Sequence, residues 1–375
     1  MMKKNTVLIL IAIIAILITV SVLLSSNFDS NRSDDQSAGQ KFIPKLYDKL
    51  NDVSSIEITN ASGKVVIVKS SEADGLSNIW KIKSKDNYPG DVTQIRKTLI
   101  EIAELEKVEA KTKKEKNYSK LGVQSFDEAS KVVTGQSSYI TVSAGSETLA
   151  SVIMGNKKSG HTSRARGIKN LNYARFADDA QVWLVAGNLT LPAFNNFMDT
   201  ELTKIPVARI KAVEISHPKG SAITISKKSK TDKDFVLKQL PKNKELSDPG
   251  ILNTIASALS NLSFDDVSNK SSDDKFNNPV KVQFVAFNGL TINMNVVNAD
   301  NKYYLWLDAK STKPLFNSLK KEDVENKDKS PDAKQEATDI NKKHSRWLYT
   351  IPTYSGQILT KQLTDLIKAK TPKKK

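Results

Sequence analysis

The sequence predicts an α+β protein, in which an N-terminal transmembrane helix precedes two tandem β-rich modules, each an antiparallel sheet with a long amphipathic helix. Residues 6–24 form one apolar run, interrupted only by hydroxyl side chains. A segment that starts near Ser55 recurs near Ala212, with matching residues 157 positions apart. In both copies apolar residues alternate with period two, which is typical of half-buried strands.

The apolar run is interpreted as an uncleaved signal anchor. A helix that rises 1.5 Å per residue spans about 28 Å over residues 6–24, close to the roughly 30 Å thickness of the hydrocarbon layer. Cleavage is the alternative, but Val22–Asn27 fits a small-residue cleavage pattern poorly. Because Lys3 and Lys4 precede the run, the positive-inside rule predicts that residues 1–5 are cytoplasmic and that the rest of the chain is extracytoplasmic.

Composition divides the remainder of the chain into a linker and two modules. Residues 25–41 are small and polar, which predicts a flexible tether. The first module is predicted at residues 42–205 and the second at residues 206–370. Residues 320–345 are highly charged with few apolar side chains, so we predict a disordered insertion there.

In the first module a hairpin is predicted, because two alternating strands flank the turn Asn60–Gly63. A third strand surrounds Trp80, and Asp91 or Thr93 is placed to cap the helix that follows. The apolar face of that helix is predicted to carry Ile95, Leu99, Ile102 and Leu105. Further strands are predicted at residues 138–143, 149–154, 173–176 and 182–185.

The second module repeats this order of hairpin, aromatic strand and helix. Ser247-Asp248-Pro249 marks the start of its helix. The matching apolar face is predicted to carry Leu252, Ile255, Leu259 and Leu262. Further strands are predicted at residues 281–287, 291–297 and 303–308. Each module is expected to close with an aromatic strand and an amphipathic tail, at residues 191–202 and 358–367.

Charge and residue usage limit the chemistry. The formal net charge is +16, and part of the lysine lies in blocks such as Lys227–Lys230, which are interpreted as solvated faces. Nucleic acid is not expected as a partner of an extracytoplasmic domain. The absence of cysteine excludes disulfides, thiolate metal sites and a cysteine nucleophile. His161, His217 and His344 are far apart in the sequence and predict no zinc site.

Several short motifs resemble sites but lack an essential part. Residues 155–162 approach a phosphate-binding loop, yet His161 stands where the lysine is required. The acidic pairs 178–179, 265–266 and 273–274 are interpreted as turn and cap residues, since neighbouring strand residues face opposite ways. Glu57 and Glu214, equivalent in the two copies, are expected to be exposed sheet residues. We therefore predict no catalytic, cofactor-binding or metal-binding residue.

Motifs along the chain resemble a bacterial family called domain of unknown function 4340, over roughly residues 42–368. The motifs are Phe42–Leu46, Ile56–Ile58, Trp80, Tyr88-Pro89, Tyr118, Leu121–Val123, Met154-Gly155, Tyr173–Arg175, Val182-Trp183 and Trp347–Tyr354. The charged residues 320–345 depart from the pattern. The resemblance implies an accessory extracytoplasmic subunit, because such proteins are encoded beside ABC-2-type transporters and a gliding-motility auxiliary component. It implies no catalytic residues.

These observations lead to a functional hypothesis. We expect a non-enzymatic accessory protein of a bacterial ABC-type, gliding-motility-like transport system, anchored once in the cytoplasmic (inner) membrane. Its expected partner is an ABC permease or an auxiliary subunit. The alternative is an envelope protein that binds a ligand or polymer in the groove between the modules. A third hypothesis is an envelope hydrolase, which a deep pocket with converging carboxylates would favour.

Overall fold

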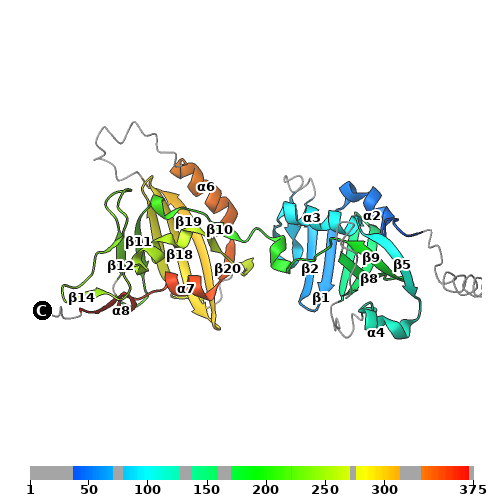
Figure 1. Ribbon diagram of the computed structural model, residues 1–375. Coiled ribbons are helices and arrows are strands. Elements are labelled where there is room, and N and C mark those ends of the chain that lie inside the picture. The colour runs from blue at the N-terminus through cyan, green and yellow to red at the C-terminus, as the bar shows by residue number, and fades with distance from the viewer. Residues whose placement is uncertain are drawn as a thin grey trace, which may run out of the picture. The chain divides into compact units, whose positions relative to one another are not determined.

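The computed structural model describes residues 37–70, 79–126, 137–158, 170–220, 222–270, 276–312 and 331–370. The described chain is α+β with antiparallel strand pairs, as predicted. It divides into two compact units (Figure 1): described residues up to Lys69 with Ile95–Leu191, and Ser70–Gln94 with the chain from Pro192 onward. The predicted anchor lies outside the described residues, within which no helix is long and apolar enough to cross a membrane.

A nine-stranded sheet has the order β4-β3-β2-β1-β6-β7-β8-β9-β5. Its strands β3 (Trp80–Ile82) and β4 (Tyr88–Pro89) lie in the segment grouped with the second unit, and the other seven strands belong to the first unit. These strands are β1 (Ser55–Asn60), β2 (Gly63–Lys69), β5 (Glu106–Thr112), β6 (Ser138–Ala144), β7 (Glu147–Lys157), β8 (Asn170–Phe176) and β9 (Val182–Gly187). The helices are α2 (Pro44–Asp48), α4 (Tyr118–Leu121) and α3 (Val92–Ala103), of which α3 begins in the segment grouped with the second unit. The 3-10 helices are η1 (Leu50–Asp52) and η4 (Glu115–Asn117).

The second unit contains a sheet with the strand order β13-β12-β11-β17-β18-β19-β20-β16. Its strands are β11 (Ile210–Ser216), β12 (Ile223–Ser226), β13 (Val236–Leu237), β16 (Asp266–Asn269), β17 (Val280–Ala286), β18 (Leu290–Ala299), β19 (Lys302–Ser311) and β20 (Trp347–Ile351). Two separate two-stranded sheets pair β10 (Glu201–Thr203) with β15 (Leu262–Ser263) and β14 (Lys244–Leu246) with β21 (Ile367–Ala369).

Helices α5 (Ile251–Ala256), α6 (Ala333–His344), α7 (Thr353–Leu359) and α8 (Leu363–Leu366) complete the second unit. It also contains the 3-10 helices η3 (Lys83–Lys85), η5 (Phe194–Phe197), η6 (Val207–Arg209) and η7 (Ser257–Ser260). Helix α5 contacts β11, while α7 contacts β18 and β19. Gly356 allows the close approach of α7, because a Cβ there would lie 2.0 Å from the Tyr303 ring.

The strand order of the two large sheets agrees with the predicted repeat. Starting at the hairpins β1/β2 and β11/β12, the two sheets have the same order of equivalent strands. The order is β2-β1-β6-β7-β8-β9-β5 in one sheet and β12-β11-β17-β18-β19-β20-β16 in the other. The register agrees as well: Ile56 lies opposite Ile67 in the hairpin, and Val213 lies opposite Ile225. All four side chains are buried. Strands β5 and β16, which lie between the helix and the return of the chain to the middle of the sheet, each form the far edge of their sheet.

The two equivalent helices differ in length. The Asp91 carboxylate caps α3 by accepting hydrogen bonds from the backbone N–H groups of Thr93 (2.8 Å) and Gln94 (3.1 Å). In the second unit α5 spans six residues and continues as the 3-10 helix η7, so the predicted long helix is shorter there. The Ser257 hydroxyl donates to the Thr254 carbonyl at 2.8 Å, a local bond that competes with regular helix.

Residues 333–344 correct the predicted disorder of residues 320–345, because they form α6. The Asp332 side chain caps this helix by accepting from the Gln335 N–H at 2.8 Å. Arg209 forms a bidentate, largely buried ion pair with Glu336, at 2.5 and 2.9 Å. Polar contacts and small alanines hold the helix, so a hydropathy criterion does not detect it. Residues 320–330 lie outside the described residues.

The end of the predicted tether is also ordered. Residues 25–36 lie outside the described part, but the Gly39 N–H donates to the Lys107 carbonyl and the Lys107 N–H donates to the Gln40 carbonyl. Lys41 pairs with Glu106 at 3.4 Å. Residues 39–41 therefore lie along the start of β5. Composition alone did not reveal this, since small polar residues form backbone hydrogen bonds as readily as others.

Helix α6 covers an open sheet edge. Strand β19 pairs with β18 along its whole length but with β20 only at Tyr303–Leu305. Beyond that point the Asn341 side chain donates to the Ala309 carbonyl at 2.7 Å and accepts from the Ala309 N–H at 2.8 Å. One amide thus makes both hydrogen bonds that a neighbouring strand would make, and the edge is not left unpaired there.

The units do not divide where the sequence places the modules. The predicted boundary follows residue 205, whereas the compact units divide after Leu191, and residues 70–94 group with the second unit. Tyr88 illustrates this grouping. Its ring is buried against Trp347 (4.9 Å between centroids) and Phe264 (5.5 Å), both of which belong to the second unit.

Replacing Asn341 with alanine is expected to destabilise the protein. The change leaves the Ala309 backbone groups without partners at a half-buried edge, which costs about 1–3 kcal/mol. Urea unfolding followed by circular dichroism measures the loss. Lys342→Ala, one residue further along the same helix and exposed, is the control and should change stability by less than about 0.5 kcal/mol. Equal effects of the two substitutions would contradict the role of Asn341.

Candidate functional site

A row of polar side chains crosses the second sheet. Glu214 on β11 lies opposite Gln283 on β17, which lies opposite Asn293 on β18, which lies opposite Asp308 on β19. We call these four residues the polar row. Because strand side chains alternate between faces, all four share the face opposite the buried Val282 and Met294. Glu214 and Asp308 are exposed, and the two amides are half-buried.

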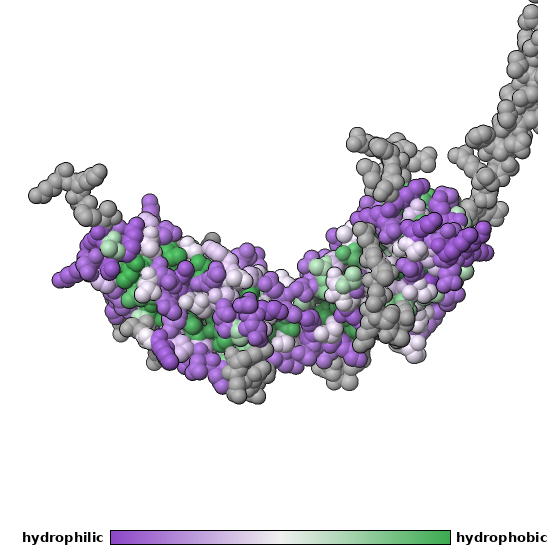
Figure 2. Space-filling model, turned by 90° about the horizontal axis from the view of Figure 1, so that it is seen from below, coloured by the Kyte–Doolittle hydropathy of each residue, from purple (hydrophilic) through white to green (hydrophobic). Residues whose placement is uncertain are grey.

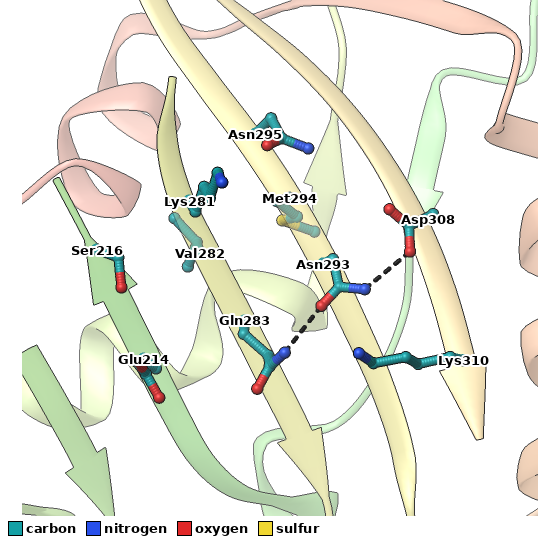
Figure 3. Close-up of a pocket in the computed structure, with 10 residues that line it drawn as sticks. All are labelled: Glu214, Ser216, Lys281, Val282, Gln283, Asn293, Met294, Asn295, Asp308 and Lys310. Atoms are coloured by element: carbon teal, nitrogen blue, oxygen red, sulfur yellow. Dashed lines mark hydrogen bonds between the residues drawn. The ribbon is translucent and has the colours of Figure 1, made fainter. Parts of the chain in front are cut away.

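Hydrogen bonds fix the orientation of the row. The Gln283 amide donates to the Asn293 side-chain oxygen at 2.9 Å, and the Asn293 amide donates to an Asp308 carboxylate oxygen at 2.8 Å (Figure 3). The Asp308 carboxylate can only accept, so the Asn293 NH₂ group must face it. That orientation in turn presents the Asn293 oxygen to Gln283. The row therefore has one defined donor–acceptor direction.

The polar row lines a hollow of about 400 Å³. Next to it runs a second row, in which Lys281, Asn295 and Trp306 lie opposite one another on β17, β18 and β19. In Figure 3 Lys310 points from β19 toward β18. Two lysines and two carboxylates give the hollow no formal net charge. The other residues that line it are Ser216, Lys281, Val282, Met294, Asn295 and Lys310.

The geometry of the row suits binding better than hydrolysis by paired carboxylates. Two strands separate Glu214 from Asp308, so their backbones lie about 14 Å apart, three interstrand spacings. Glycoside hydrolases need their two carboxyl groups roughly 5–9.5 Å apart. Amide and carboxylate groups at fixed spacing, by contrast, can hydrogen-bond a polar ligand or a protein surface.

The equivalent face of the first sheet is covered by α4 and the residues that follow it. Position by position, Glu57, Thr141 and Ser151 correspond to the first three residues of the polar row. Beside them the Arg175 guanidinium donates to the Val123 carbonyl at 2.7 Å and to the Ser125 hydroxyl at 2.6 Å. Helix α4 and the residues after it pack here in an apolar cluster. The cluster contains Tyr118, Val123, Ile153 and Val182.

The length of one connection accounts for the difference between the two faces. Residues 113–137 join β5 to β6, whereas only residues 270–279 join β16 to β17. In the shorter connection Phe276 packs on Tyr304 (5.1 Å) and Trp306 (6.5 Å). Phe276 thus contacts β19, and the polar row lines an open hollow.

The residues considered from the sequence are not brought together into one site. Of the acidic pairs, Asp179 accepts from the Gln181 N–H in a turn, Asp266 pairs with Lys85 at 2.7 Å, and residues 273–274 lie outside the described residues. His161 lies outside them as well. Glu214 is exposed as predicted, and Glu57 is half-buried and pairs with Lys64.

The loop-like motif 155–162 begins inside a strand, because β7 runs to Lys157. Gly155 is needed for a close approach: a Cβ there would lie 2.3 Å from the Leu121 carbonyl oxygen. Within the described ranges no group of three or more His, Cys, Asp or Glu side chains is placed to hold a metal ion.

His344 occupies a second polar cluster, which is buried. Its Nδ1 lies 2.7 Å from the Tyr349 hydroxyl, and the ring also hydrogen-bonds the Leu202 backbone. Burial, reinforced by the nearby Lys343 ammonium, lowers the pKa of His344 to about 4, although Asp199 opposes the shift. Burial also raises the pKa of Tyr88, which hydrogen-bonds Tyr349, to about 12. These groups stay neutral near pH 7, as a structural cluster requires.

The fold and the polar row define an α+β protein of two sheet-based units, one of which presents an open polar face. A family model described as a domain of unknown function (DUF4340) matches residues 80–279, more than half of the chain. The chain therefore belongs to the DUF4340 family, as the sequence motifs suggested. Neither a curated protein nor a solved structure matches it significantly.

The buried His344 predicts a loss of stability in mild acid. As the pH falls below the ordinary histidine pKa of 6.5, the unfolded chain binds a proton, but folded His344 stays neutral until about pH 4. Stability from this group is fully present above pH 6.5 and declines between pH 6.5 and 4, by roughly 3 kcal/mol. Urea unfolding at several pH values measures the slope. His344→Gln should flatten it; an unchanged slope in His344→Gln would disprove the assignment.

Proposed function

We propose that this chain is a non-enzymatic, membrane-anchored extracytoplasmic accessory protein of a bacterial ABC-type transport system. In this proposal the polar row of the second unit binds a permease or an auxiliary subunit. Membership of the DUF4340 family and the predicted anchor at residues 6–24 support it. The observation that carries it is the hydrogen-bonded, accessible polar row.

A row held on a sheet is suited to recognition. Neighbouring strands space its groups about 4.8 Å apart, and the hydrogen bonds between Gln283, Asn293 and Asp308 limit side-chain freedom before a partner arrives. Less side-chain entropy is then lost on binding. Charges of both signs favour a partner surface with complementary charges. In the view of the whole chain in Figure 2, hydrophilic residues predominate on the visible surface, with hydrophobic residues in separate patches between them.

Anchoring would strengthen a weak interface of this kind. A chain held in the same membrane as its partner experiences a high effective concentration, so a modest affinity suffices. Replacing residues 6–24 with a cleavable signal should therefore weaken the complex while the two units remain folded.

A second candidate function is binding of an envelope polymer. Amides and carboxylates are the side chains that hydrogen-bond sugar hydroxyls, and Trp306 lies in the adjacent row. This candidate places the polymer on the polar row. Recovery of a glycan, and of no membrane protein, by the intact chain would favour it over the transport hypothesis.

The proposed topology predicts an extracytoplasmic C-terminus. A reporter that folds only after export, fused after Lys375, should be active, because Lys3 and Lys4 retain the N-terminus in the cytoplasm. Activity of a cytoplasmic reporter at the same position would rule out this topology.

The proposed partner surface predicts that Asn293→Arg abolishes capture of the membrane partner. Arginine at this position breaks the donor–acceptor direction of the row and adds a charge to the hollow. Pull-down of the full chain in mild detergent, followed by mass spectrometry, should recover an ABC permease or auxiliary subunit with the unaltered chain only.

Ser151→Arg is the matched control for this experiment. Ser151 occupies the position in the first sheet that corresponds to Asn293, so the control adds the same side chain to an equivalent strand position. It should leave capture intact. Equal loss of capture with both variants would show that the polar row is not the specific interface.

A further inference from the structure

Lys227 is a buried lysine at a core position of the second sheet. It follows β12 in the same alternation as Ile223 and Ile225, so its side chain shares their face. Its backbone N–H donates to the Lys211 carbonyl at 3.0 Å, which extends the ladder to β11. Only 7% of the residue is exposed. The lysine run 227–230 was predicted to be a solvated face, and Lys227 departs from that prediction.

Aromatic rings rather than carboxylates surround the Lys227 ammonium. Its Nζ lies 5.1 Å from the centroid of Phe235 and 5.8 Å from that of Phe287. The acids nearest in sequence have other hydrogen bonds: Asp232 accepts from backbone N–H groups at 3.0 Å, and Asp234 accepts from the Asn253 amide at 2.8 Å. Across the described ranges no carboxylate forms an ion pair with Lys227.

Lys227 lines a cavity of about 350 Å³. The exposed Lys233 also lines this cavity. Thr254 and Ser257 line it as well, and the Thr254 hydroxyl donates to the Gly250 carbonyl at 3.2 Å while the Ser257 hydroxyl donates to the Thr254 carbonyl at 2.8 Å. Because both hydroxyl protons already form hydrogen bonds to backbone carbonyls, the two hydroxyl oxygens can only accept hydrogen bonds from a ligand.

We propose that this cavity binds a small oxyanion that also carries hydroxyl groups, namely a sugar acid or a sugar phosphate. The oxyanion would accept hydrogen bonds from Lys227 and Lys233, and the ligand hydroxyls would donate to Thr254 and Ser257. Lys227 has little exposure to water and no carboxylate partner in the described ranges, so its ammonium is poorly solvated and a bound anion would compensate for this. Cation–π contacts with Phe235 compensate for only part of it.

The cavity is distinct from the polar row. Thr224 lies between Ile223 and Ile225 on β12, faces the opposite side, and pairs with Glu214 of the polar row. Lys227 shares the core face instead. Binding at the cavity is therefore independent of the proposed partner surface, and each can fail without the other.

Isothermal titration calorimetry of the full chain in detergent tests the proposal. The probes are glucuronate, glucose 6-phosphate and, as the neutral control, glucose, all at the same ionic strength. We expect at least one of the two acidic sugars to bind and glucose not to bind. Which acidic sugar binds distinguishes a carboxylate site from a phosphate site. Failure of both to bind the unaltered chain, or equal binding of glucose, would overturn the proposal.

Lys227→Met provides the matched test, because methionine keeps an unbranched apolar chain against Phe235 and Phe287. Loss of a charge-assisted hydrogen bond should weaken binding roughly ten- to hundredfold. Lys228→Met removes the same charge from the exposed neighbouring residue and should leave binding unchanged. If both variants weakened ligand binding equally, the effect would come from the overall charge of the protein, and the proposed site at Lys227 would be wrong.

Thermal unfolding separates binding from folding. Without ligand, Lys227→Met should be about as stable as the unaltered chain, because the substitution leaves no described carboxylate without a partner. The acidic sugar that binds should raise the melting temperature of the unaltered chain and not that of Lys227→Met. If Lys227→Met fails to fold, the exposed Lys233→Met replaces it and must weaken binding. A melting temperature that rises equally with sodium chloride would overturn the proposal.

Discussion

The buried ring of Tyr88 is the contact on which much of the second unit depends. It packs edge-on against Trp347 and Phe264, and its hydroxyl bonds Tyr349, which in turn bonds His344 at the end of α6. Helix α6 carries the amide that completes the open edge of β19, and β19 carries one end of the polar row. An aromatic cluster therefore connects an early segment of the chain to the strand that forms the candidate surface.

Two sheets with one strand order present different outer faces. In the first unit the described residues Tyr118–Ser125 of a long connection pack over the face and accept hydrogen bonds from Arg175. In the second, the equivalent connection is short, and the face keeps its polar row and its hollow. The repeat thus conserves the arrangement of the core strands, and the length of a single connection decides which face stays accessible to a partner. Connections vary more easily than packed strands because they carry fewer buried contacts.

Alternation predicted the central strands well, since Ile56, Val142 and Phe284 are buried at the expected period. It missed β5, whose sequence EKVEAKT is largely charged and sits at a sheet edge. It also missed α6, which polar contacts hold. The polar row could not be predicted from the sequence. Gln283 and Asn293 match no motif, and only the register between β17 and β18 places them side by side. Lys227 looked like part of a solvated run, because sequence does not report burial.

The chain passes between the two units three times, at residues 69/70, 94/95 and 191/192. Cleavage at a single point between Leu191 and Pro192 would leave Tyr88 on the N-terminal fragment and its aromatic partners on the C-terminal fragment. The fragment from Pro192 onward would then have a gap in its core where Tyr88 belongs. Reassociation of the two fragments would be driven by filling that gap, so this protein is a natural system for split-fragment complementation.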